Sequence, residues 1–169
     1  MVCNIMHVCK YAVRAASHSY WLSTDAPAPT VAVIGNETDQ HISRCVVCQA
    51  PAPLLTLHSQ TSKPEPCPQG WDPVWQGYSF LMHTIGCMGG GQQLSSPGSC
   101  LESFRVNPYI ECDTDGKCDY YANKYSYWLV TLDGDTTRSY DVTERTLRNN
   151  EFENHVSRCS VCVLHTESA

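Results

Sequence analysis

Histidine and cysteine recur in one spacing at two places in the chain. The spacing is His-x3-Cys-x2-Cys, and it is formed by His41, Cys45 and Cys48 and again by His155, Cys159 and Cys162. Thiolate and imidazole are ligands that Zn²⁺ prefers, so each occurrence could supply part of a zinc site. A Cys-x-x-Cys pair can also be a redox-active dithiol, or its cysteines can form disulfides with partners elsewhere.

The cysteine content favours the disulfide interpretation. Eleven cysteines in 169 residues are many for a cytosolic protein and usual for an extracellular one built on disulfides. Apart from Cys87, the second half of the chain carries an even set of six: Cys67, Cys100, Cys112, Cys118, Cys159 and Cys162. We therefore predict disulfides and no metal site, with Cys159 and Cys162 as two anchors that reach back to Cys100 and Cys67.

No group of residues is typical of a catalytic site. The sequence has no Gly-x-Ser-x-Gly, no His-Glu-x-x-His and no phosphate-binding loop. We interpret Ser99 as a helix cap rather than a nucleophile, and His58-Ser59 and Tyr78-Ser79 as residues that hold strands and turns. We predict no catalytic residue and no enzymatic activity.

The chain carries the same four motifs twice, about 110 residues apart. In the first copy they are Cys3-x5-Cys9, Tyr11-Ala12, Ser19–Leu22 and His41–Cys48, and in the second they are Cys112-x5-Cys118, Tyr121-Ala122, Ser126–Leu129 and His155–Cys162. A shared order with drifting loop lengths indicates a duplicated module, because loops tolerate insertions. We place the boundary between the copies at residues 49–53.

The first copy lacks a counterpart of the segment that precedes Cys112. Met1 lies two residues before Cys3, whereas the second copy begins near residue 54. We therefore expect an N-terminally truncated chain, in which residues 1–53 are the C-terminal half of a first module and residues 54–169 are a complete second module.

Three cysteines are left over by this arrangement. Cys45 and Cys48 have no first-copy counterparts of Cys67 and Cys100 to pair with, and Cys87 has no equivalent in the repeat. We predict that Cys45 and Cys48 are free or paired with sequence outside the chain, and that Cys87 is unpaired.

Charge and hydrophobicity exclude some partners. The net charge is −6 and there is no basic run, which argues against nucleic acid and anionic membranes. No run of apolar residues is long enough to span a membrane, and residues 1–10 do not have the pattern of a signal peptide. Asn36-Glu37-Thr38 is a candidate N-glycosylation site.

Short aromatic and β-branched runs dominate the chain and predict strands. They are Val31–Ile34, Leu54–His58, Tyr78–His83, Tyr109–Cys112 and Tyr125–Thr131. A hairpin is expected at Cys112–Cys118, with Asp115-Gly116 at its turn and a disulfide across it.

Only two short helices are expected. One covers Ser99–Arg105, with Ser99 as N-cap and Glu102 at the third position, and a weaker candidate covers Thr143–Phe152. We predict an all-β fold with short helical turns, in which two tandem homologous disulfide-rich modules form one compact domain.

Four stretches closely resemble the C-terminal non-collagenous domain of type IV collagen. They are Gly77–Thr84, Ser96–Arg105, Tyr120–Leu129 and His155–Cys162. In that family the domain consists of two tandem homologous modules with six cysteines each. The resemblance implies the pairs Cys67–Cys162, Cys100–Cys159 and Cys112–Cys118, and only Cys3–Cys9 in the first module.

The resemblance implies a role in assembly. Domains of this family select chains and form trimers, and two trimers then dock face to face as a hexamer in the basement-membrane network. The expected partners are other type IV collagen chains, in the extracellular matrix outside the cell. A hairpin inserted into a neighbouring subunit would extend that subunit's sheet.

The resemblance also bears on ligands and crosslinks. In the family a chloride ion supports the hexamer, and Arg14 fits the position of the arginine that binds it, although Ala15–Ser17 lack the usual aspartate. Residues 25–33 and 132–140 match the stretches joined by a sulfilimine bond and contain neither Met nor Lys, so we expect no such bond. No other cofactor is expected.

A second function remains open. The chain has no Gly-x-y run, so it has no triple helix of its own. It could instead be a secreted disulfide-rich binding domain that acts on cell-surface receptors without a collagen stalk. Glycine at every third position upstream would decide for collagen.

Overall fold

The computed structural model describes residues 19–81, 93–120, 128–132 and 152–166, and the backbone alone at residues 2–3 and 9–10. Within these residues the chain forms short strands and two 3-10 helices, which confirms the all-β prediction. The strands are β1 Val2–Cys3, β2 Cys9–Lys10, β3 Ser19–Leu22, β4 Val33–Ile34, β5 Leu54–His58, β6 Trp71–Ser79, β7 Cys100–Leu101, β8 Tyr109–Cys112, β9 Lys117–Asp119 and β10 Arg158–Leu164; the 3-10 helices are η1 Gly35–Gln40 and η2 Pro97–Ser99. None of the described helices is long and apolar enough to cross a membrane.

The chain divides into two compact units. Unit 1 consists of Met1–Val47 and Asn107–Lys124, and unit 2 consists of Cys48–Val106 and Tyr125–Ala169. The two units therefore do not coincide with the two copies of the repeat, because unit 1 combines the first copy with a segment from the second.

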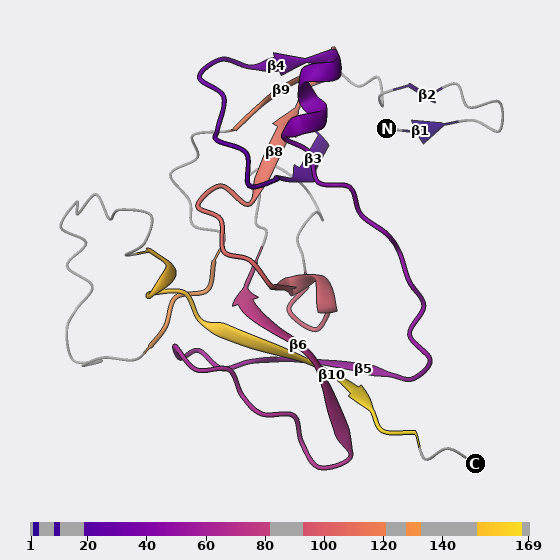
Figure 1. Ribbon diagram of the computed structural model, residues 1–169, viewed down its shortest axis with the longest axis vertical. Helices are drawn as coiled ribbons and strands as arrows, with labels where there is room; N and C mark the ends of the chain where they lie inside the picture. The colour runs from indigo at the N-terminus through magenta and orange to yellow at the C-terminus, as the bar shows by residue number, and fades with distance from the viewer. Residues whose placement is uncertain are drawn as a thin grey trace. The chain divides into compact units, whose positions relative to one another are not determined.

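Unit 2 is built on a four-stranded antiparallel sheet in the order β5-β10-β6-β7 (Figure 1). Strand β10 lies inside the sheet, where Val161 is opposite Thr56 of β5 and Trp75 of β6. Cys159, Val161 and Cys162 are completely buried. A strand covered on both faces favours a continuous run of small and apolar residues, which Cys159–Val163 provides.

The helix expected at Ser99–Arg105 is wrong. The helical turn η2 ends at Ser99, and its N-cap is Ser96, whose hydroxyl accepts a hydrogen bond from the Gly98 N–H at 3.3 Å. The next two residues form β7 and pair with the end of β6. Local sequence favours a helix there, but the strand pairing and the disulfide of Cys100 impose an extended backbone.

The other predicted strands show mixed outcomes. Leu54–His58 and Tyr109–Cys112 are confirmed by β5 and β8, and Val31–Ile34 is shortened to β4. Strand β6 begins earlier than predicted, at Trp71, and ends at Ser79. It tolerates Pro73 because the pairing with β10 shifts register between Val161 and Cys162.

Two predicted elements fall largely outside the described residues. Of Tyr125–Thr131, the described part forms isolated bridges at Trp128 and Val130. Of the helix predicted at Thr143–Phe152, only Phe152 is described.

Unit 1 contains a four-stranded sheet in the order β3-β8-β9-β4 (Figure 1). Its two outer strands come from the first copy of the repeat and its two central strands are the hairpin of the second copy. Gly116 adopts a φ of +79° at the turn, as the Asp-Gly sequence predicts, and the Asp113 carboxylate accepts hydrogen bonds from the N–H groups of Asp115 and Lys117. The core around the hairpin includes Val33 and Ile110.

The two copies also share a hydrogen-bonded corner. In the first copy the N–H of Thr24 donates to the carbonyl of His41, and the N–H of Ser43 donates to the carbonyl of Leu22. The second copy repeats both bonds, and the bridge Ser23–Ile42 recurs as Val130–Val156; the repeated bonds run from Thr131 to His155 and from Ser157 to Leu129. The duplicated sequence therefore builds the same local structure twice.

Candidate functional site

Two disulfides fix β10, which lies inside the sheet of unit 2, to the segments that carry Cys67 and Cys100. Cys162 is bonded to Cys67, with 5.9 Å between their Cα atoms, and Cys159 is bonded to Cys100, with 5.7 Å. The hydroxyl of Ser160 donates to the Glu65 carbonyl at 2.6 Å and adds a third attachment. Both sulfurs of this Cys-x-x-Cys pair are therefore occupied by disulfides, and neither is a thiol.

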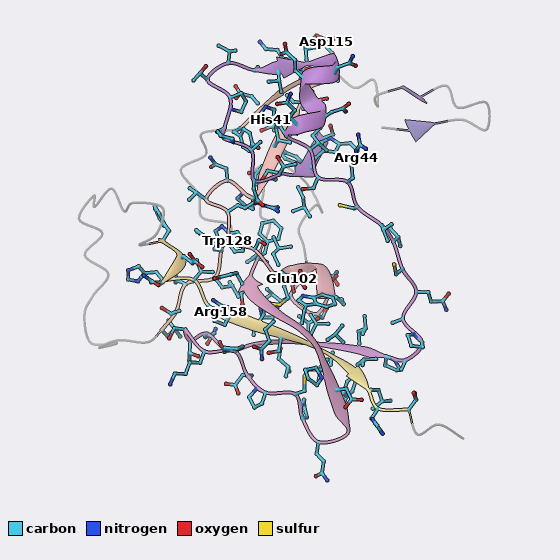
Figure 2. All side chains as sticks on the ribbon, viewed as in Figure 1. His41, Arg44, Glu102, Asp115, Trp128 and Arg158 are labelled. Carbon is cyan, nitrogen blue, oxygen red and sulfur yellow. A yellow bond between two sulfur atoms is a disulfide. The ribbon has the colours of Figure 1, made fainter. Side chains whose placement is uncertain are left out.

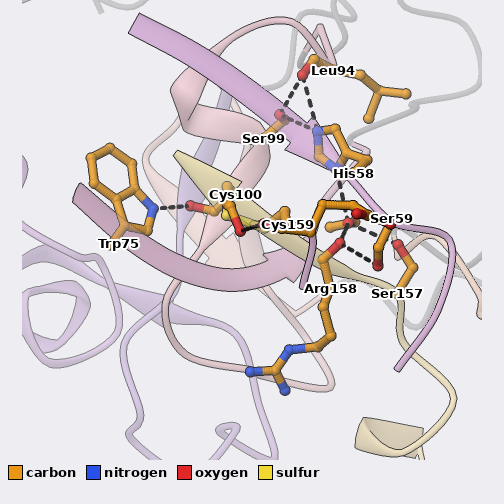
Figure 3. The surroundings of a disulfide bond; sticks show 12 residues. His58, Ser59, Trp75, Leu94, Ser99, Cys100, Ser157, Arg158 and Cys159 are labelled. Atoms are coloured by element: carbon orange, nitrogen blue, oxygen red, sulfur yellow. Dashed lines mark hydrogen bonds between the residues drawn. A yellow bond between two sulfur atoms is a disulfide. The ribbon is translucent and has the colours of Figure 1, made fainter. Parts of the chain in front are cut away.

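His58 is the centre of a polar network beside the Cys100–Cys159 disulfide (Figure 3). Its Nδ1 lies 2.8 Å from the Ser79 hydroxyl, and its Nε2 lies 3.0 Å from the Ser99 hydroxyl and 3.0 Å from the Leu94 carbonyl. The Ser157 hydroxyl donates to Ser79 at 2.8 Å. The network joins the ends of β5 and β6, the turn η2 and the start of β10.

The partners of His58 define its protonation. A carbonyl oxygen can only accept, so Nε2 carries the hydrogen that points to Leu94, and Nδ1 accepts in the neutral ring. Burial lowers the pKa of His58 from its usual 6.5, and the hydrogen bond to the Leu94 carbonyl opposes this in part. The lowered pKa favours the neutral ring near pH 7.

The distances between His58 and the serine hydroxyls are those of a catalytic dyad, but the burial of the serines is not typical of a catalytic site. Ser79, Ser99 and Ser157 are completely buried. A nucleophile must reach its substrate, so these hydroxyls hold the strands together instead. The sequence interpretation of His58-Ser59 and Tyr78-Ser79 as structural is in line with this geometry, although no local spacing indicates that they meet.

Four aromatic rings pack together in unit 2. Trp128 lies 5.1 Å from Phe104 and 5.5 Å from Phe80 between ring centroids, and Tyr78 lies 5.7 Å from Phe104. The Trp128 indole N–H donates to the Arg105 carbonyl at 3.0 Å, which fixes the ring. These contacts form an aromatic cluster in unit 2.

Arg158 contacts the Tyr78 ring of this cluster; Figure 2 labels Arg158 together with Trp128. Its guanidinium carbon lies 3.9 Å from the centroid of the Tyr78 ring, a cation–π geometry. The Tyr78 hydroxyl donates to the Glu153 carboxylate. Burial and then this hydrogen bond raise the pKa of Tyr78, and the charge of Arg158 opposes the rise. Sequence reasoning did not identify Glu153 or Arg158 as partners of Tyr78.

The hairpin in unit 1 is held by a disulfide and by packing against β3. Cys112 and Cys118 are directly opposite in the ladder and are bonded, with 4.0 Å between Cα atoms. Tyr109 meets Tyr20 edge to face at 5.5 Å between ring centroids. The Ser23 hydroxyl donates to the Asn107 carbonyl at 2.6 Å. The second copy's hairpin is thus an integral part of the first copy's sheet.

Cys45 and Cys48 occupy a very different environment from their counterparts in β10. Both are free and exposed, and Val46 and Val47 between them are 82% and 101% exposed. The same positions in the second copy form a strand between β5 and β6. The same motif therefore forms a paired strand in the second copy, whereas in the first copy it has no strand partner within the described residues.

Several predicted site residues lie outside the described residues. They include Arg14 and Cys87, and also the side chains of Cys3 and Cys9, whose backbones are opposite one another in the β1–β2 ladder. Asn36 is exposed on η1. No cluster of three or more His, Cys, Asp or Glu side chains suited to a metal occurs in the described ranges.

Comparison with known proteins gives a consistent result over almost the whole chain. Residues 1–50 and 53–164 match the family described as "C-terminal tandem repeated domain in type 4 procollagen". The chain is 50% identical to the human collagen alpha-5(IV) chain over 169 residues and 47% identical to the mouse collagen alpha-4(IV) chain over 167 residues. These alignments cover 98% and 97% of this chain but 10% of each relative, so the chain spans about a tenth of their length. The chain belongs to the family of C-terminal tandem repeated domains of type 4 procollagen.

Proposed function

We propose that this chain is a structural domain of the extracellular matrix that assembles with other type IV collagen chains in the basement membrane. The family membership and the names of the relatives support this role. So do the three disulfides that lie within the described residues, because such bonds form and persist in the oxidising space outside the cell. The role is structural rather than enzymatic.

The observation that carries the proposal is the placement of the second hairpin. Strands β8 and β9 belong to the second copy, yet they lie between β3 and β4 of the first. Ile110 is 0% exposed and Tyr109 is 5% exposed there, so the inserted hairpin buries apolar surface as well as forming ladder hydrogen bonds. In this chain, therefore, the hairpin of one copy completes the sheet of the other copy.

The first copy carries the equivalent hairpin, β1–β2. In the described part of the chain it forms a sheet of two strands, with Val2 opposite Lys10 and Cys3 opposite Cys9. An isolated two-stranded hairpin is marginally stable in water. By the symmetry of the repeat, β1–β2 inserts into the sheet of a neighbouring chain, as β8–β9 inserts into unit 1.

This exchange accounts for the assembly steps that the family resemblance implies. If each chain donates one hairpin to the next, the contacts are head to tail and close as a ring, which fits a trimer. Chain selection then depends on how well the donated hairpin fits the receiving sheet. We further propose that two such trimers dock face to face as a hexamer.

Two further features of that hexamer rest on the resemblance alone. Arg14 is the proposed chloride ligand, and it lies outside the described residues. The absence of Met and Lys from residues 25–33 and 132–140 predicts a hexamer without a sulfilimine bond. A hexamer held only by non-covalent contacts would separate into single chains in denaturant.

Removal of the hairpin tests the proposal. The full chain and a variant that lacks residues 1–10 would each be mixed with the corresponding domain of the collagen alpha-5(IV) chain, and complexes would be measured by size-exclusion chromatography with light scattering. We expect the full chain, but not the variant, to enter complexes. Hydrogen exchange at β5, β6 and β10 would show that the variant is folded. Equal assembly of the two chains would contradict the proposal.

A further inference from the structure

The glycosylation triplet Asn36-Glu37-Thr38 has no part in the proposed assembly. It is the single Asn-x-Ser/Thr triplet in the sequence. In the structure it lies on η1, directly after the edge strand β4.

Asn36 is placed where a large substituent disturbs no packing. No residue of η1 is buried, and Asn36 and Glu37 are exposed. The side chain of Asn36 makes no hydrogen bond within the described part of the chain, whereas the Thr38 hydroxyl donates to the Gly35 carbonyl at 2.6 Å. The turn is also held by backbone bonds from His41 and Ile42 to the Thr38 carbonyl. Modification of the Asn36 amide would therefore break no hydrogen bond of the described residues.

Among the described residues, the surface beside Asn36 is an open sheet edge with exposed apolar side chains. Strand β4 is the last strand of the unit 1 sheet. Val31 is 74% exposed and Ile34 is 59% exposed. An unpaired edge that carries apolar side chains invites pairing with another chain, and natural proteins protect such edges. No charged side chain is present in Val31–Ile34 to do so.

We propose that Asn36 carries an N-linked oligosaccharide that covers this open edge of β4. In the transfer, a bond forms between Nδ2 of Asn36 and the anomeric carbon of a sugar carried by a polyprenyl diphosphate. The bond from that carbon to the diphosphate oxygen breaks, the polyprenyl diphosphate leaves, and the amide nitrogen loses a proton. No oxidant or reductant is needed.

N-linked glycosylation takes place on the secretory route, which the proposed function requires, so this proposal rests on that function. The test therefore directs the chain into that route. The full chain with an added signal sequence would be translated in the presence of microsomes, and only protease-protected chain would be examined. We expect a mass increase that a peptide-N-glycosidase removes, retained in Thr38→Ser and lost in Asn36→Gln and Thr38→Ala. Protected chain without a glycan would overturn the proposal. Because no partner chain is present, the result is independent of collagen assembly.

The covering role has its own test. Glycosylated chain and Asn36→Gln, both folded by hydrogen exchange, would be compared by sedimentation velocity over a concentration series. We expect Asn36→Gln to self-associate at lower concentration, and the added substitution Ile34→Lys to reverse that change. Identical association of the glycosylated and unglycosylated chains would overturn the covering role.

Discussion

Gly77 lies where the backbone of β7 crosses close to β6. A Cβ atom placed on Gly77 would be 2.2 Å from the Leu101 carbonyl oxygen, which is backbone and cannot rotate away. Gly77→Ala should therefore lower the free energy of unfolding by about 3 kcal/mol, the upper end of ordinary overpacking. Urea unfolding followed by tryptophan fluorescence would measure the loss.

The matched control is Gln76→Ala, one residue earlier on the same strand. Gln76 is exposed, so this change should alter the free energy of unfolding by less than about 0.5 kcal/mol. Equal effects of the two substitutions would show that the close contact between Gly77 and Leu101 is absent.

His58 should make the stability depend on pH. Its pKa in the folded chain lies below the usual 6.5, so between these two values the unfolded chain binds more protons than the folded one. The stabilisation is complete above pH 6.5 and is lost as the pH falls toward the folded pKa. We expect the urea midpoint of the native sequence to fall between about pH 7.5 and 5.5 by more than that of His58→Gln.

Urea unfolding of the native sequence and of His58→Gln at each pH provides the comparison for this effect. If His58→Gln and the native sequence lose the same stability on acidification, burial of His58 does not have the proposed consequence.

Disulfides act at the scale of the elements that they join. The three described bonds have sequence separations of 95, 59 and 6, for Cys67–Cys162, Cys100–Cys159 and Cys112–Cys118. Loop-closure entropy predicts losses of roughly 5, 4 and 2 kcal/mol when both cysteines of a pair become alanine. Thermal unfolding of the three double variants would establish the order.

The free pair Cys45 and Cys48 supplies the control for this series. Both thiols are exposed, so the same double change to alanine there should leave the unfolding temperature unaltered. A hairpin variant as unstable as the Cys67–Cys162 variant would contradict the entropic account.

Because the hairpin β8–β9 lies in the sheet of unit 1, we expect a destabilising substitution in it to affect unit 1 and not unit 2. Ile110 is 0% exposed in the core of unit 1. Ile110→Ala should cost about 2–5 kcal/mol and should remove hydrogen-exchange protection from β3, β4, β8 and β9. Protection of β5, β6 and β10 should remain, and its equal loss in both units would show that the units do not unfold separately.

The sequence predicted elements well where local pattern and final structure agree. The uninterrupted runs at β5 and β8 and the Asp-Gly turn are of this kind. The helix at Ser99–Arg105 failed because the neighbours of Cys100 and Leu101 are distant in sequence. The same reason hid the network of His58, whose partners Ser79, Ser99 and Leu94 come from separate segments.

At the scale of the whole molecule, the repeat predicted that one structure is built twice, and the shared corner of hydrogen bonds bears this out. It did not predict which sheet each hairpin completes. Each copy has a sheet that could receive a hairpin, and the order of the sequence does not show which hairpin enters which sheet. The structure places the second hairpin in unit 1, which makes the destination of the first hairpin the central question.

Native mass spectrometry tests that question most directly. The full chain would be mixed with the equivalent domain of the collagen alpha-5(IV) chain, and the number of chains in each complex would be read from its mass. We expect complexes of three chains, or of six, that contain this chain. If this chain is folded, with its disulfides formed, but remains a monomer while the alpha-5(IV) domain assembles without it, the proposed function is wrong.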